Sequence, residues 1–263
     1  MWRLVFLLFF PLLAFSHEGI PPSYSFLKHR EHKGVGYDTG YTSVDLMASP
    51  IDFPQFYPFL NVRGHVFNDG RFAANLGVAG RYLSPRKDWI LGINVFYDYR
   101  DTKLFAGQQL GAGAELFFRK TVLRFNGYMP IGVVKRREDS RIRVALANLQ
   151  GGIEASLLEW DHFILRGAVG VYYLAKRTFD DATFGKAWGT QIQLTSTIYQ
   201  WIEAGIETTY DHIFNFTFQG YLALKIPLGN SRLHFPKNSF LQTLFQPIRR
   251  NEIIPIQKKH TKF

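Results

Sequence analysis

The chain has 263 residues, no cysteine and a formal net charge of +10. The lack of cysteine excludes a disulfide framework and thiolate metal sites, and the length suits one large domain or two small ones. The positive charge could suggest nucleic-acid binding. However, the basic residues gather in KRREDSRIR (135–143) and in the C-terminal segment, which is more typical of polar loops. We therefore expect no nucleic-acid partner.

The N-terminus has the pattern of a secretory signal peptide. Arg3 precedes an apolar run over residues 4–15, and Ala14-Phe15-Ser16 supplies a small-residue cleavage site. A membrane-spanning helix is the alternative, but the run is shorter than the ~20 residues that a bilayer span needs. The sequence thus predicts a signal peptide over 1–16 and an exported protein, followed by a short periplasmic lead-in over 17–33.

The lead-in contains HREH (29–32), whose two histidines could bind a metal at i, i+3 on a helix. No further ligands accompany them, so we expect no metal site and no cofactor.

From Phe72 onward, apolar residues alternate with glycine, amide and charged residues through nine successive segments. Period-two alternation over about ten residues predicts β-strands that have one apolar and one polar face. We expect the apolar face to meet lipid and the polar face to meet a lumen. The lipid-facing candidates are Leu91, Ile93, Val95, Leu165, Val169 and Leu222, and Ala168 is a small residue on the lumen face. The candidate lumen residues are Arg81, Asn94, Asp98, Glu115, Glu154, Arg166, Glu203 and Glu207.

A soluble sheet would also alternate, but two features favour a membrane barrel. The strands are near the ~9–11 residues that cross a bilayer at a tilt. Aromatic residues also sit toward strand ends, as in the interfacial girdles of outer-membrane barrels. Examples are Tyr82, Trp89, Tyr173, Trp188 and Tyr210. The fold class predicted is all-β: a closed antiparallel transmembrane barrel over 34–228, because backbone groups in lipid must pair internally.

Link lengths predict twelve strands. Short links at 84–88, 119–120, 158–161 and 199–201 alternate with longer ones, as periplasmic turns alternate with surface loops. If both barrel ends are periplasmic, the strand number is even and the turn 84–88 follows an even-numbered strand. Residues 34–67 must then hold three strands, and a phase slip near Gly40 to Ser43 could hide a turn.

Four segments, NLGVAGRYL, LGINVFYDY, LGAGAEL and RFNGYMPIG, resemble in this order the β-domain of the inverse autotransporter family, which includes intimin and invasin. The segment QPIRRNEIIPIQKK (246–259) is similar to the one that follows the barrel in that family. The resemblance implies a twelve-stranded outer-membrane barrel whose post-barrel segment threads the lumen and leads to a surface-exposed passenger. We expect this chain to lack the peptidoglycan-binding module and the passenger.

The tail, residues 229–263, is therefore predicted to thread the lumen and plug it. Arg249, Arg250 and Asn251 are its candidate residues, and their cations would face Asp98, Glu115, Glu154, Glu203 and Glu207. An independent porin that conducts small solutes is the alternative. A third hypothesis is a surface-binding role for the basic loop around Arg136 and Arg137, which would contact a host or surface ligand.

The remaining motifs do not predict an enzyme. GAGAEL (111–116) is glycine-rich but lies within a strand, and no P-loop lysine follows it. Glu203 and Glu207 could form an acid–base pair, but lumen salt bridges with Arg81 or Arg166 are the more common arrangement. NGYMP (126–130) indicates a strand end with its tyrosine at the membrane interface. The expected partners are outer-membrane lipid of a diderm bacterium, periplasmic chaperones and the barrel-insertion machinery, which would recognise the aromatic alternation of residues 215–224.

Overall fold

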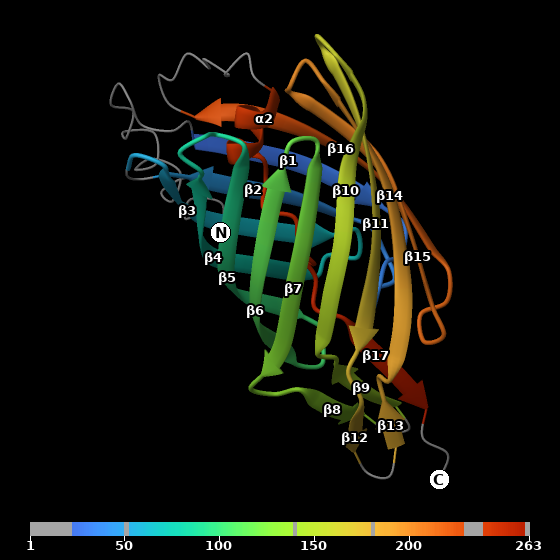
Figure 1. The fold of residues 1–263 in the computed structure, drawn as a ribbon. Helices are drawn as coiled ribbons and strands as arrows, with labels where there is room; N and C mark the ends of the chain where they lie inside the picture. The colour runs from blue at the N-terminus through green and yellow to red at the C-terminus, as the bar shows by residue number, and fades with distance from the viewer. Residues whose placement is uncertain (1–22, 50–52, 139–140, 180–181, 229–238, 261–263) are drawn as a thin grey trace, which may run out of the picture.

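The computed structural model describes residues 23–49, 53–138, 141–179, 182–228 and 239–260. Twelve antiparallel strands close into a barrel, as the sequence predicted (Figure 1). Among the described residues, no helix is long and apolar enough to cross a membrane. The predicted signal peptide lies outside the described residues. The barrel strands are β1 (Ser23–Glu31), β2 (Tyr41–Ala48), β3 (Phe56–Phe67), β4 (Phe72–Leu83), β5 (Trp89–Asp101), β6 (Ala106–Phe118), β7 (Thr121–Ile131), β10 (Asn148–Trp160), β11 (Phe163–Leu174), β14 (Ala187–Ile198), β15 (Ile202–Asp211) and β16 (Thr217–Leu228).

The start of the barrel differs from the prediction. Strand β1 lies inside the segment predicted as a periplasmic lead-in, and it closes the barrel by pairing with both β2 and β16. Residues 34–67 therefore hold two strands, not three, while the nine strands from Phe72 onward are confirmed. The segment KHRE is polar in sequence because Lys28 and Arg30 face the lumen, where each pairs with a glutamate.

The two ends of the barrel have different links. The short turns at 84–88, 119–120, 161–162 and 199–201 lie at one end, which we call the short-turn end. At the opposite, long-loop end, two links carry hairpins of their own: β8 (Lys135–Glu138) with β9 (Arg141–Ala145), and β12 (Arg177–Phe179) with β13 (Ala182–Phe184). In outer-membrane barrels short turns are periplasmic and long loops face outward.

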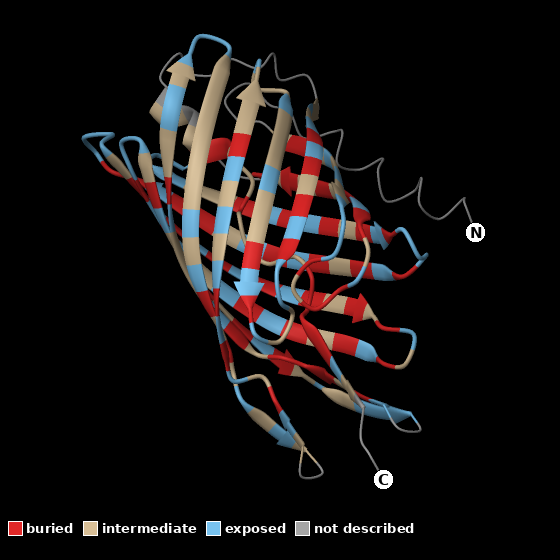
Figure 2. Ribbon diagram, turned by 90° about the vertical axis from the view of Figure 1, so that its right-hand side faces the viewer, coloured by how far each residue is buried: buried red, intermediate tan, exposed pale blue. Residues whose placement is uncertain are grey.

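Outward and inward positions alternate along the barrel strands, apart from a register shift in β10 between Ser156 and Leu158. Figure 2 shows the resulting banding of exposed and buried residues. Ile93 is 61% exposed and Val169 is 56% exposed, whereas Asn94 and Asp98 on the inner face are 4% and 1% exposed. Among the predicted girdle residues, Trp188 is 70% exposed and Tyr210 is 60% exposed. An apolar outer surface of this extent requires a lipid environment.

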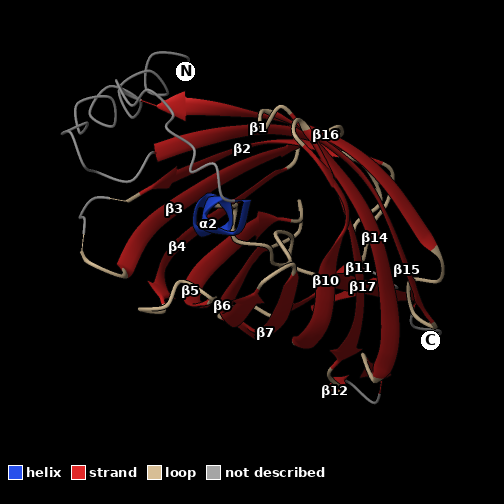
Figure 3. Ribbon diagram, turned by 45° about the horizontal axis from the view of Figure 1, so that its top comes forward, coloured by secondary structure: helices blue, strands red, loops and turns tan. Residues whose placement is uncertain are grey.

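The C-terminal segment runs back through the barrel. Its described part begins with a short helix, α2 (Ser239–Gln242), and a 3₁₀ turn, η2 (Thr243–Phe245), which Figure 3 shows inside the ring of strands. It ends as β17 (Ile256–His260), which pairs with β9 at the long-loop end. Strands β8, β9 and β17 form a three-stranded sheet, which we call the cap sheet.

Candidate functional site

The lumen contains a bidentate ion pair between the tail and β5. Arg250 donates from Nη1 and Nη2 to the two carboxylate oxygens of Asp98, at 2.7 and 2.6 Å. The guanidinium also lies 4.3 Å from the ring centre of Phe96 and 5.2 Å from that of Tyr128. A Cβ at Gly111 would come within 2.5 Å of Arg250 Nη2, so the glycine makes room for this side chain. Such a pair is both strong and geometrically specific.

Arg249 points to other strands. Its Nη1 lies 3.0 Å from a Glu154 oxygen on β10, and its Nη2 lies 3.4 Å from Glu203 on β15. Glu154 also accepts from Arg124 at 3.0 Å, and Arg166 lies 3.9 Å away. This glutamate thus gathers cations from two barrel strands and from the tail.

Two tail residues beyond the arginines continue the network. The backbone N–H of Asn251 donates to the Tyr128 hydroxyl at 2.7 Å. The Glu252 carboxylate accepts from Lys28 at 2.6 Å, from Arg63 at 3.3 Å and from the Tyr41 hydroxyl at 3.0 Å. Glu252 was not predicted as a tail contact, although it is the one acidic residue in the segment 246–259.

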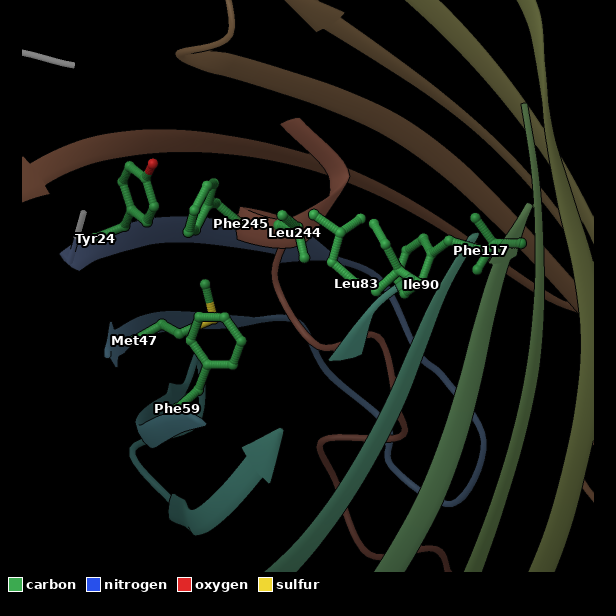
Figure 4. Close-up of a cluster of buried hydrophobic side chains, with 9 residues drawn as sticks. Tyr24, Met47, Phe59, Leu83, Ile90, Phe117, Leu244 and Phe245 are labelled. Carbon is green, nitrogen blue, oxygen red and sulfur yellow. The ribbon is translucent and has the colours of Figure 1, made fainter. Parts of the chain in front are cut away.

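At the short-turn end the tail is held by apolar contacts. Leu244 and Phe245 pack into a buried cluster supplied by inward-facing barrel residues such as Tyr24 and Phe59 (Figure 4). Arg81 donates to the backbone carbonyls of residues 243, 244 and 246, which caps the irregular turn after η2. The sequence signal for this cluster was the presence of large apolar residues on the polar face, including Ile90 and Phe117.

At the long-loop end, where the tail leaves the lumen, it is held by contacts to its backbone. Arg100 donates to the carbonyls of Gly36 and Ile254. Gly36 has a φ of +79°, and a Cβ there would come within 2.6 Å of Pro255 Cα. Outside the barrel, Lys258 pairs with Asp38. Partial burial raises the pKa of Asp38, but the Lys258 hydrogen bond and charge outweigh it, so this pKa is lower than usual.

The structure places all eight predicted lumen residues on the inner face, but several pair differently than expected. Glu115 pairs with Arg81 and Arg124, not with the tail. Glu207 pairs with Arg30 and not with the tail, whereas Glu203 pairs with the tail residue Arg249, as expected. The expected salt bridges of these two glutamates with Arg81 or Arg166 are therefore wrong, because those arginines are taken by the tail carbonyls, Glu115 and Glu154.

Tyr128 also differs from its predicted position. It is 4% exposed and faces the lumen, so the expectation that it lies at the membrane interface is wrong. Its hydroxyl supports the tail at Asn251, as described above.

The tail does not fill the lumen evenly. A cavity of about 250 Å³ remains beside it, lined by the tail and by inward residues of β1, β2, β7, β10, β11, β14, β15 and β16. Its lining includes Gln150, Arg166, Ala168, Gln193 and Glu207. A cavity of this size with such polar groups has room for ordered water.

The histidine motif forms part of a strand and its loop. His29 contacts Thr42 at 2.9 Å and Glu31 at 2.8 Å. Within the described ranges, no group of three His, Cys, Asp or Glu side chains could hold a metal ion.

A closed twelve-stranded sheet with an apolar outside and a charged inside defines an outer-membrane β-barrel. Residues 54–147 match the model of the family described as inverse autotransporter, beta-domain. This match confirms the resemblance inferred from the sequence. A search of curated protein sequences finds no match.

Two solved structures are similar in fold. One, from work on the in-meso crystallization of membrane proteins, has 17% identity and a TM-score of 0.69, and covers 90% of this chain and 100% of its own. The other is the COG4313 outer membrane channel from Pseudomonas putida F1, with 10% identity and a TM-score of 0.62 over 79% of this chain and 96% of its own. At these identities the likeness concerns the fold alone.

Proposed function

We propose that the chain is an outer-membrane anchor of the inverse autotransporter type, with a lumen plugged by its own tail. The bidentate pair of Arg250 with Asp98 carries this proposal, because both side chains are only 1% exposed inside the barrel. Breaking such a pair leaves a buried charge without a partner, at a cost of about 3–5 kcal/mol. The tail is thereby held where a solute would otherwise pass.

The contacts at the two ends of the tail support the same role. Apolar packing of Phe245 holds the segment at the short-turn end, and pairing of β17 with β9 holds it at the long-loop end. The tail therefore passes through the barrel from the expected periplasmic side to the expected outer side. In this role the protein performs no chemistry on a substrate.

Single-channel recording in planar bilayers tests the plug. The mature chain should show low conductance, and removal of residues 231–263 should open a large and steady one. The truncated chain must first show the heat-dependent gel shift of a folded barrel. If the intact chain has a large conductance that truncation leaves unchanged, the plug is ruled out.

The second candidate is a porin that conducts small solutes. The cavity beside the tail favours this role, because polar side chains such as Gln150, Gln193 and Glu207 line it. The fold likeness to an outer membrane channel is compatible with it. The same recording separates the two roles, since a porin conducts with the tail in place.

We also propose that the barrel-insertion machinery recognises β16, the last barrel strand. Phe216 and Phe218 project outward and are 57% and 43% exposed. Replacing both by serine should lower the yield of membrane-inserted barrel, whereas removing residues 231–263 should not. If the tail deletion alone prevents insertion, the recognition signal lies in the tail.

A further inference from the structure

The cap sheet carries a row of cations across its three strands. Arg136 on β8 pairs in register with Arg143 on β9, which in turn pairs with Lys258 on β17. Residues directly opposite in an antiparallel sheet project from the same face, and neighbouring strands lie ~4.8 Å apart. The row therefore brings three positive groups side by side, and the third comes from the tail.

This arrangement places like charges directly opposite each other on neighbouring strands, which destabilises a sheet. Two acidic residues lie beside these cations: Glu138 is opposite Arg141 in register, and Asp38 pairs with Lys258. Arg143 uses one N–H donor on the Thr102 carbonyl. The side chains of Arg136 and Arg141 are exposed, and no acceptor among the described residues lies within hydrogen-bond range of either. The donors of these guanidinium groups remain available to a ligand from outside.

The opposite face of the sheet holds the row in place. Ile142 and Val144 are fully buried in an apolar cluster that also contains Phe184 of the neighbouring hairpin. Lys135 and Lys259 lie over the rings of Phe179 and Phe184, 4.7 and 5.4 Å from their centres. The sheet thus sits firmly beyond the barrel mouth, where Figure 1 shows β8, β9 and β17.

We propose that the cap sheet binds the phosphate groups of outer-leaflet glycolipids through Arg136, Arg141, Arg143 and Lys258. Arginine forks match phosphate oxygens in pairs, and adjacent cations at the interstrand spacing share one phosphate. The long-loop end faces outward, where the surrounding leaflet presents such groups. The three strands contain no Phe, Tyr or Trp on which bases could stack, which disfavours single-stranded nucleic acid. Because Lys258 belongs to the tail, the site is complete only when the tail is threaded.

The test uses the folded full-length chain in detergent, titrated with purified lipopolysaccharide. The double variant Arg136→Gln with Arg141→Gln should bind about tenfold more weakly or worse, given the usual strength of charge-assisted hydrogen bonds. Arg86→Gln with Lys87→Gln removes two exposed cations at the short-turn end and is the matched control. The control should bind like the unmodified chain. A heat-dependent gel shift confirms that each variant is folded.

Further measurements show whether the bound phosphate belongs to the lipid or is free inorganic phosphate. Enzymatically dephosphorylated lipopolysaccharide should bind at least tenfold more weakly, and inorganic phosphate at equal molarity should not compete. Lys258→Gln should weaken binding by a smaller factor. Equal binding of the dephosphorylated lipid, equal losses in the control variant, or tighter binding of a DNA oligonucleotide would each overturn the proposal. If Lys258→Gln changes nothing, the tail takes no part in the site and the composite row is wrong.

Discussion

The two sides of the lumen behave differently although their sequences alternate alike. On β3 to β7, which we call the contact wall, inward residues are almost all buried. On β10, β11, β14 and β15, the open wall, most inward residues are half-buried, because the tail leaves a cavity there. Figure 2 shows both kinds of banding.

The difference lies in what faces each wall. Arg63, Asn75, Arg81 and Asp98 of the contact wall all bond to the tail. On the open wall Arg249 reaches Glu154 and Glu203, and inward residues such as Gln150, Ala168 and Gln193 line the cavity. The same residue types are therefore structural on one side and solvated on the other. The partner of a charged lumen residue can therefore be inferred only when the wall on which that residue lies is known.

The largest effect expected from this comparison concerns two of the three carboxylates that pair with the tail arginines. Asp98→Asn leaves Arg250 buried without a counter-charge, so the free energy of unfolding should fall by about 3–5 kcal/mol. Glu203→Gln should cost less than about 1 kcal/mol, because Arg249 keeps Glu154 and the site is partly hydrated. Urea unfolding in liposomes measures both. Equal losses would mean that the walls do not differ.

The next prediction compares the stability cost of a charge that faces lipid with that of a charge that faces the cavity, at neighbouring residues of the open wall. Val169→Arg places a charge at mid-strand in lipid and should cost about 2–4 kcal/mol. Ala168→Arg points the same side chain into the cavity and should cost much less, apart from a modest steric penalty. Unfolding in liposomes again provides the comparison. Small, equal effects would show that the outer face does not meet lipid.

Much of this architecture was readable in the sequence, because period-two alternation is a local property of each strand. Alternation placed Ile93 outward and Asp98 inward, and the link lengths gave the correct number of strands. Strand β1 was missed because the end of its inner face carries Lys28 and Arg30, whose partners Glu252 and Glu207 lie far away in the chain. Strand periodicity says nothing about such partners.

The candidate site was predicted in outline only. Opposite charge indicated that the tail and the lumen attract, but pairing depends on the register of the tail within the barrel. That register is set by contacts without a periodic signal, such as Phe245 in its apolar cluster and Gly111 beneath Arg250. The predicted pairing of Glu203 and Glu207 with Arg81 or Arg166 was therefore wrong, whereas the expected contact of Glu203 with a tail arginine is present.

The smallest effect concerns the exposed end of the tail. The carboxyl of Asp38 has a lowered pKa, so its pairing with Lys258 stabilises the fold at neutral pH and is lost as the pH falls through that pKa. Both side chains are largely exposed, so Asp38→Asn should cost less than about 1 kcal/mol at pH 7. The gap between variant and unmodified chain should close as the pH is lowered below the ordinary range of Asp. A gap that widens in acid would contradict the pairing.

The position of the tail can be measured most directly by thiol labelling, because the chain has no cysteine. Asn251→Cys lies in the lumen beside Tyr128, and Lys87→Cys lies on an exposed short turn. A polymer-linked maleimide too bulky to enter the barrel should modify the turn variant rapidly in the folded protein. It should leave the tail variant unmodified until urea unfolds the barrel. Equal labelling of the two variants in the folded state would show that the tail lies outside the lumen and would contradict the account.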